Sequence, residues 1–292
     1  MPFFSDSEGQ RNSIPKIKHS RSQLRSHLNP YEEGAYSLFL SSDTYPELFD
    51  LAFPDLKQES PTGWKTSSKG GMKYRWWRQL DSGSVESIQD WCSRFEKYVL
   101  LGLNAHIEDS FTSELDFCMA LDFNYDPAAD KRTLFGDAEY QLKYKDSRQH
   151  RSVLLQGLVE AVSDLPIPAN FKSNYAVSCV PGPHDEASVQ YTLALKLAKS
   201  LLVEFIDAEL HCPKPPMKGT RVEEKIPIWQ SLYDQECVVL SGDVSGKLVV
   251  IVDDLYQSGA TLWMFAKYLK SIGASHIFGI PCVKSLRDSD NQ

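Results

Sequence analysis

The stretch LVVIVDDLYQSGATL, residues 248–262, constrains the fold of this chain more than any other segment. It begins with a continuous apolar run, which is typical of a strand buried on both faces of a parallel sheet. Asp253 and Asp254 follow directly, and burying adjacent carboxylates is costly unless they meet a partner or a ligand. A small, hydroxyl-rich turn then leads into a helical pattern. The segment therefore predicts a strand, a turn and a helix, with a polar site at the carboxyl end of the strand.

The same alternation of strands and helices extends over the chain from residue 112 onward. Strands are expected at 115–123, 175–180, 236–240, 248–252 and 275–283. Helices are expected at 187–203 and 260–273, whereas 139–162 predicts a strand or turn followed by a helix. Alternation with continuous Val and Ile runs predicts an α/β fold, with a parallel sheet flanked by helices.

The first 111 residues follow a different pattern. Residues 1–30 are rich in Ser, Asn and basic side chains and predict a mobile basic arm, and residues 31–111 predict an accessory region. Within it, 84–101 predicts a packing helix. Its apolar face comprises Ile88, Trp91, Cys92, Phe95 and Val99. Residues 72–80, MKYRWWRQL, mix basic and aromatic side chains. This pattern is typical of a core or interface strand, and it also occurs in surfaces that stack nucleic-acid bases.

Charge and cysteine usage exclude some classes of protein. A net charge of −8 argues against a protein that coats nucleic acid with its whole surface. The six cysteines are scattered without a CxxC pair, so we expect neither a zinc site nor a disulfide framework, and Cys118 and Cys179 are expected in the core. This usage suits a reducing cytosol. No apolar run has membrane-spanning length, so a cytoplasmic protein without membrane contact is expected.

The turn after the two acids has the features of an anion site. Gly259 permits close backbone approach, and the hydroxyls of Ser258 and Thr261 lie where the first N–H groups of a helix are unpaired. Two carboxylates would repel a phosphate there, but they could bind vicinal sugar hydroxyls or act with a nearby Mg²⁺. The arrangement thus predicts a ligand with a phosphate at one end and a diol in the middle. A ribose 5-phosphate unit fits.

The segment VVIVDDLYQSGATL resembles the 5-phosphoribosyl 1-pyrophosphate (PRPP) loop of type I phosphoribosyltransferases. The order of the remaining elements, with the LKY run at 142–144 before a helix, is similar to the ComF-like branch of that family. The resemblance implies a type I phosphoribosyltransferase core over 112–292 with an N-terminal hood or accessory region. It also implies a transferase of the glycosyltransferase class, active in nucleotide metabolism. Such an enzyme uses PRPP and Mg²⁺ to move a phosphoribosyl group to or from a nitrogenous base or related acceptor.

By that resemblance, each part of the site has an expected role. Asp253 and Asp254 would hold the ribose hydroxyls as the catalytic pair, with Mg²⁺ bound mainly through substrate and water. The ribose 5-phosphate would be held by Gln257, Ser258, Gly259, Ala260 and Thr261. The pyrophosphate loop would be Pro181, Gly182, Pro183 and His184, and a closing loop would supply Lys214, Lys218 and Arg221. Stacking on the acceptor is expected of Tyr256, Trp229 or Phe278.

Departures from the family pattern keep other functions open. The segment after the expected pyrophosphate loop has no arginine and carries Asp185 and Glu186. The second hypothesis is therefore a non-catalytic sensor that binds PRPP or a nucleotide and acts through a protein or nucleic-acid partner. A nucleic-acid partner would rest on the basic arm and residues 72–80, and a homodimer is equally compatible with the sequence.

Overall fold

The fold is taken from a computed structural model of the whole chain. It describes residues 20–21, 26–32, 35–40, 50–54, 65–66, 73–78, 82–101, 114–145, 147–165, 167–171, 174–182, 188–215, 217 and 219–286. The chain forms two compact units. The smaller contains residues 20–100 and 164–169, and the larger contains 1–19, 101–163 and 170–292. The expected boundary at residue 111 lies outside the described residues, as does the arm up to residue 19.

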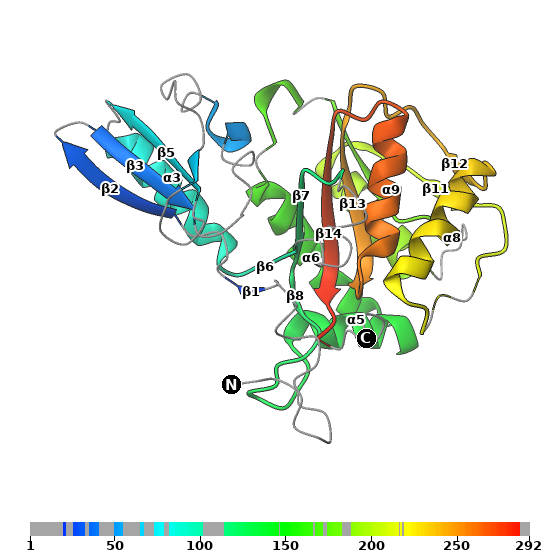
Figure 1. Cartoon of the computed structure of the whole chain (residues 1–292). Coiled ribbons are helices and arrows are strands. Elements are labelled where there is room, and N and C mark those ends of the chain that lie inside the picture. The colour runs from blue at the N-terminus through cyan, green and yellow to red at the C-terminus, as the bar shows by residue number, and fades with distance from the viewer. Residues whose placement is uncertain are drawn as a thin grey trace. The chain divides into compact units, whose positions relative to one another are not determined.

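The larger unit is built on a parallel sheet (Figure 1). Its strands are β7 (Phe117–Ala120), β9 (Tyr175–Cys179), β10 (Glu204–Ile206), β13 (Leu248–Tyr256) and β14 (His276–Lys284). They lie in the order β10-β9-β13-β14-β7, and the short β8 (Asp122–Phe123) pairs with the end of β14. All of these pairings are parallel. The structure thus confirms the α/β class with a parallel sheet.

The strand order reverses direction between β9 and β13. After β9 the chain passes through α7 (Val189–Leu201) to β10 on one side, whereas after β13 it passes through α9 (Ala260–Ser271) to β14 on the other. The two connections diverge at the carboxyl ends of β9 and β13, which is the position where open parallel sheets bind ligands. The predicted acids at 253–254 lie on β13 at this reversal.

Apolar stripes attach the helices to the sheet. The predicted inward face of α9 is fully buried, with Leu262, Phe265, Ala266 and Leu269 each 0% exposed. The helix ends before Gly273, whose φ of +101° is accessible to glycine at little cost. α5 (Leu134–Lys145) lies at the end toward which β13 and β14 point (Figure 1), and α6 (Arg148–Asp164) follows it.

One local prediction was wrong, one helix was not predicted, and one predicted strand lies in a different sheet. Residues 139–145 form the second half of α5 and not a strand or turn. The helix α8 (Val222–Asp234) was not predicted, because Pro227 interrupts its pattern. The predicted strand at 236–240 is β12 (Val238–Leu240), which pairs antiparallel with β11 (Ala208–Leu210) in a separate two-stranded sheet.

The smaller unit contains an antiparallel sheet and one described long helix. The sheet order is β2 (Ser26–Glu32), β3 (Ala35–Leu40), β5 (Lys73–Arg78) and β4 (Lys65–Thr66), while β1 (Ser20–Arg21) pairs with β6 (Val99–Leu100). The predicted helix is α3 (Ser82–Phe95), so its last apolar position falls in β6 instead. All five residues of the expected apolar face are buried, at 7% exposure or less. Among the described residues, no helix has the length and apolar character needed to cross a membrane.

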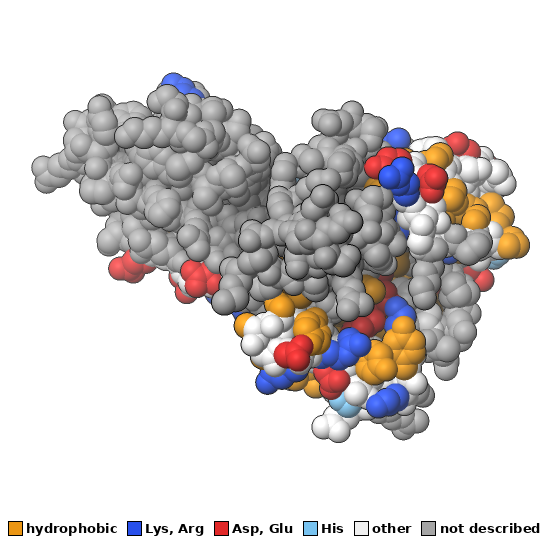
Figure 2. Space-filling view, turned by 60° about the horizontal axis from the view of Figure 1, so that its bottom comes forward, with side chains coloured by type: hydrophobic (Ala, Val, Ile, Leu, Met, Phe, Trp, Pro, Cys, Tyr) orange, Lys and Arg blue, Asp and Glu red, His pale blue; other side chains and the backbone are white. Residues whose placement is uncertain are grey.

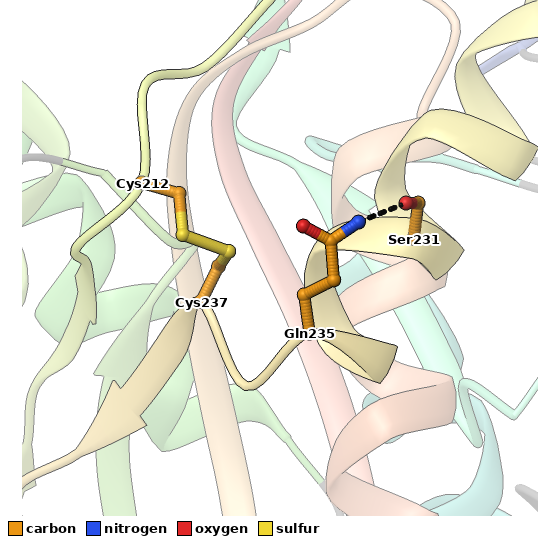
Figure 3. The surroundings of a disulfide bond; sticks show 4 residues. All are labelled: Cys212, Ser231, Gln235 and Cys237. Carbon is orange, nitrogen blue, oxygen red and sulfur yellow. Dashed lines mark hydrogen bonds between the residues drawn. A yellow bond between two sulfur atoms is a disulfide. The ribbon is translucent and has the colours of Figure 1, made fainter.

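A disulfide bond joins Cys212 to Cys237, which corrects the expectation that the cysteines form none. The disulfide lies next to the β11–β12 pair. Beside it, the His211 N–H donates to the Cys237 carbonyl at 2.9 Å and so extends the pairing of the two strands. Figure 3 shows it beside the end of α8, where Gln235 Nε2 donates to Ser231 Oγ at 2.7 Å. Cys92, Cys118, Cys179 and Cys282 lie outside this bond and are buried, as was expected of Cys118 and Cys179.

The disulfide should contribute measurably to stability. It closes a loop with a sequence separation of 25, for which chain entropy predicts about 3 kcal/mol. We expect a dithiol reductant to lower the melting temperature of the unchanged protein by several degrees. Cys212→Ala should melt at the reduced value and should not respond to the reductant. Alkylation of all six cysteines in the native, unreduced protein would contradict the bond.

Candidate functional site

The two acids lie where β13 loses one of its neighbours. β13 pairs with β9 only from Leu248 to Val252, whereas its pairing with β14 continues to Tyr256. Among the described residues, Asp253 and Asp254 therefore lie on a part of β13 that pairs with β14 and not with β9, beyond the carboxyl end of β9. Figure 2 shows the surface at the end toward which β13 and β14 point. There, basic and acidic side chains lie next to one another among hydrophobic ones.

Asp253 is the buried member of the pair, at 9% exposure. Its Oδ1 accepts from the Asp254 N–H at 2.9 Å. Burial and the neighbouring Asp254 charge raise the pKa of Asp253 to about 8, although the Asp254 N–H, Lys214 and Lys143 act in the opposite direction. A carboxyl with this pKa carries a proton for much of the time at neutral pH and can then donate as well as accept.

Asp254 is paired with a cation from a different element. Lys143 on α5 lies with its Nζ 2.9 Å from Asp254 Oδ2 and 3.6 Å from Glu139 Oε1. Burial alone would lower the pKa of Lys143, but Asp254, followed by Glu139 and Asp253, raises it above its usual value. Burial and the Asp254 charge likewise raise the pKa of Glu139, whereas Lys143 and Arg132 lower it. Charge thus alternates from Glu139 through Lys143 to Asp254.

Three buried thiols on other strands of the same sheet lie within reach of the charge of Asp253. They are Cys118 on β7, Cys179 on β9 and Cys282 on β14. Burial raises the pKa of each thiol, that of Cys179 to about 12, and the Asp253 charge adds to the effect in all three. They remain protonated at neutral pH and act as small packing residues rather than nucleophiles.

The loop after β13 is packed tightly beneath its glycine. Gly259 has a φ of +84° and is the N-cap of α9. A Cβ atom there would lie 2.4 Å from the Tyr256 ring and 2.6 Å from Trp263 Nε1, two groups that are joined by a 2.8 Å hydrogen bond. Ser258 and Ala260 are buried, while Gln257 and Thr261 are partly exposed. The first N–H groups of α9 have no intrahelical partner by virtue of helix geometry, so the loop has the elements of an anion cradle.

A second lysine lies beneath this loop. Lys284, at the end of β14, is 0% exposed and donates from Nζ to the Gln257 carbonyl at 2.8 Å. Its Nζ also lies 5.4 Å from the centre of the Tyr256 ring. Because a buried ammonium is costly without such contacts, Lys284 ties the loop to the last strand and places a positive charge beside it.

The structure brings together some of the other predicted residues. The Lys214 Nζ lies 4.7 Å from the centre of the Trp229 ring. Burial lowers the pKa of Lys214, and both Asp253 and Asp254 raise it, so this lysine belongs to the electrostatic surroundings of the acids. Arg221 is exposed at the start of α8, where its N–H donates to Glu224 Oε2 at 3.2 Å. Lys218 lies outside the described residues.

The expected pyrophosphate loop is partly committed to other contacts. The Gly182 N–H donates to the Ala208 carbonyl at 3.4 Å, and the Gly182 carbonyl accepts from the Leu210 N–H at 2.8 Å. Pro181 is buried next to it. Pro183 and His184 lie outside the described residues. The described part of this segment is therefore joined to β11.

The structure corrects the expectation that Trp229, Tyr256 or Phe278 stacks on an acceptor. Trp229, Tyr256 and Phe278 are among the largest fully buried side chains. Tyr256 is covered by the Gly259 turn, and Phe278 packs edge-on against Phe117, with ring centres 6.3 Å apart. None of the three offers an exposed ring face to a base.

Sequence reasoning missed the residues that neutralise the acids. Glu139 and Lys143 were not singled out, because 139–145 was taken for a strand or turn. Their spacing of four is the signal that could have found them, since it places both on one side of a helix. Lys284 directly follows the apolar run of the last strand. Lys284 thus follows the apolar run of β14 in the same way as Asp253 follows the apolar run of β13.

Comparisons with known proteins find only partial similarity. No known protein-family profile matches the chain. Ribose-phosphate pyrophosphokinase C of Dictyostelium discoideum is 41% identical over 51 residues, which is 18% of this chain and 16% of that protein. The match therefore spans about a sixth of that relative's length.

Solved structures give low similarity scores. Phosphoribosylpyrophosphate synthetase from Mycobacterium smegmatis has a TM-score of 0.33 at 12% identity, over 84% of this chain and 80% of that one. Purine phosphoribosyltransferase from Pyrococcus horikoshii Ot3 has a TM-score of 0.29 at 17% identity, over 48% and 83%. A hypoxanthine phosphoribosyltransferase from Staphylococcus aureus has a TM-score of 0.25 at 12% identity, over 50% and 62%. These values leave the family undecided.

The Gly259 turn predicts a strong substitution effect. Gly259→Ala adds a Cβ atom that the Tyr256 ring and Trp263 cannot accommodate without moving, so we expect a loss of about 2–4 kcal/mol in the free energy of unfolding. Gly246→Ala is the matched control, because Gly246 has a φ of +69° but open space around it. It should cost about 1 kcal/mol. Equal losses in denaturant unfolding would show that the close packing does not matter.

Asp253 predicts a dependence of stability on pH. Its folded-state pKa of about 8 exceeds the unfolded value of about 3.9, so the folded protein holds this proton more tightly. The resulting stability is complete below pH of about 4 and is lost as the pH rises toward 8.

Asp253→Asn should remove this loss while keeping an oxygen that accepts from the Asp254 N–H. We expect the variant to be about 1–3 kcal/mol more stable than the unchanged protein at pH 8.5, and to differ little near pH 4. Asp234→Asn, at an exposed aspartate of α8, is the control. Parallel stability curves from pH 4 to 8.5 would contradict the raised pKa.

Proposed function

We propose that this chain binds PRPP at the carboxyl end of β13 and transfers its phosphoribosyl group to a nitrogenous acceptor, or catalyses the reverse. The observation that carries the proposal is the acidic pair at the reversal of the strand order, followed by the Gly259 turn into α9. A sugar diol beside the acids and a phosphate over the first turn of α9 would then lie one after the other along the chain. The partial similarity to a ribose-phosphate enzyme is compatible with this proposal.

Each part of the site would have a chemical role. Asp254 would accept a hydrogen bond from one ribose hydroxyl, and Asp253, which exchanges a proton near neutral pH, would accept from or donate to the other. Gln257 to Thr261 would hold the 5-phosphate through N–H groups and the Ser258 and Thr261 hydroxyls. As the bond from C1 to pyrophosphate breaks, positive charge develops on the ribose and negative charge on the leaving group. Groups fixed before the reaction would stabilise both charges.

Mg²⁺ is part of the proposal as a companion of the substrate. Within the described ranges, no group of three His, Cys, Asp or Glu side chains could hold a metal ion alone. The acids would therefore not ligate Mg²⁺ directly. The ion would be held near them through substrate oxygens and water, since it keeps several waters and takes few carboxylates. Bound there, it would supply neutralising charge at the pyrophosphate.

A second candidate function is a sensor that binds PRPP or a nucleotide without turning it over. One observation favours it: both the N–H and the carbonyl of Gly182, in the expected pyrophosphate loop, are hydrogen-bonded to β11. A loop held in this way offers fewer N–H groups to a pyrophosphate. The sensor would act through a protein partner or a second copy of the chain, or through nucleic acid, for which the basic-aromatic segment at 72–80 includes β5.

Calorimetric titration tests the ligand. PRPP with Mg²⁺ should bind the unchanged protein with micromolar affinity. Asp253→Asn/Asp254→Asn should weaken binding by about 100-fold, because the hydrogen bonds between the ribose hydroxyls and two charged or ionisable carboxyl groups are altered. Asp234→Asn should bind normally. Absence of binding to the unchanged protein would refute the proposal.

A second measurement separates the two candidates. Release of pyrophosphate from PRPP in the presence of a panel of nitrogenous bases would establish the transferase. Binding without release for any base would favour the sensor.

A further inference from the structure

The Lys143–Asp254 ion pair joins two elements that are distant in sequence. The bond between them spans 111 positions and links α5 to β13 at 2.9 Å. An exposed ion pair between neighbouring turns of a helix contributes little to stability. Here the side chain of Asp254 is only 18% exposed and that of Glu139 only 7%, although the Lys143 side chain between them is 35% exposed. The contact therefore lies at the edge of the protein interior, where a charge interaction is stronger than on the open surface.

Glu139 gives the lysine a fixed position. It is one helical turn before Lys143 on the same side of α5, and its carboxylate lies 3.6 Å from Nζ. Burial and the Asp254 charge raise the pKa of Glu139, and Lys143 lowers it, so the cation favours the ionised form of Glu139. Lys143 is thus held from its own helix while it contacts the acid on β13.

We propose that Lys143 is a positioning residue of the acidic pair: its ammonium occupies Oδ2 of Asp254 and so fixes the direction in which Oδ1 meets a ribose hydroxyl. The inference rests on the proposed function, because it takes the ribose of PRPP as the ligand of the pair. By this inference, α5 contributes a residue to the site in addition to the loop at 253–261.

Charge balance supports the same role. Without Lys143, three carboxyl groups would share this region: Glu139, Asp253 and Asp254. The ammonium lowers the pKa of Asp253, so its removal should raise that pKa further. The groups that face the pair are Glu139 and Lys143 from α5, Lys214 from the segment after β11, Cys118 from β7, Cys179 from β9 and Cys282 from β14. The thiols stay neutral, which leaves Lys143 and Lys214 as the cations among them.

The test compares Lys143→Met, which removes the charge and keeps an unbranched side chain one atom shorter, with Lys143→Arg, which keeps a positive charge. Lys145→Met is the matched control, since Lys145 is an exposed lysine of the same helix. One readout is free of ligand: titration of ¹³C-labelled aspartate carboxyl groups by NMR, with the Asp253 resonance assigned by its loss in Asp253→Asn. The other is the affinity for PRPP with Mg²⁺ as a function of pH.

We expect Lys143→Met to shift the Asp253 titration upward by about one pH unit and to weaken PRPP binding by about 10-fold at pH 7. Part of the lost affinity should return at higher pH, where the pair ionises again. Lys143→Arg should bind within about threefold of the unchanged protein, and Lys145→Met should match it in both readouts.

Two results would overturn the inference. One is an Asp253 titration in Lys143→Met identical to that of the unchanged protein. The other is a shifted titration with unaltered PRPP affinity across the pH range. If the unchanged protein fails to bind PRPP, the proposed function fails and the ribose role of Lys143 fails with it. The NMR titration then still decides whether Lys143 controls the ionisation of the pair.

Discussion

Two adjacent carboxyl groups at the edge of the core are the constraint on which the rest of this site depends. Asp253 is nearly buried and Asp254 follows it, so their mutual repulsion must be reduced by protonation, by cations or by donors. The structure uses all three: a raised pKa at Asp253, the Asp254 N–H, and the lysines at 143 and 214. These groups come from a strand, a helix and a connecting segment. The larger unit must therefore fold as a whole before the acids have their partners.

The turn after the acids is fixed by a second set of contacts. β13 and β14 remain paired to Tyr256 and Lys284, and the Tyr256 carbonyl accepts from the Ser285 N–H at 2.9 Å. Lys284 holds the Gln257 carbonyl, and Gly259 closes over the Tyr256 ring. The acids and the start of α9 thus form one packed segment. A ligand that binds here would meet groups already in place and would lose little affinity to ordering the protein.

The sequence predicts this segment because its information is local. A continuous apolar run, two acids and a glycine-containing turn before a helical stripe specify strand, turn and helix without reference to the rest of the chain. The partners of the acids are not local. α5 buries few large apolar residues, with Gly136, Ala138, Glu139 and Leu142 inside, so its periodicity gave no helix signal. The Cys212–Cys237 bond likewise depends on the β11–β12 pairing, which spacing alone does not reveal.

The segment from Cys212 to Arg221, which contains the residues of the expected closing loop, is fixed at both ends. This limits how far it can move. Cys212 is bonded to Cys237 at one end, and at the other the chain enters α8 after Arg221. Lys214 lies two residues from the disulfide, over the Trp229 ring of that same helix, and its charge acts on both acids. Any closure over a ligand must therefore occur between these two fixed points. Because the charge of Lys214 acts on both acids from a position over the Trp229 ring, it would act at the proposed site as a preset charge more than through a large movement.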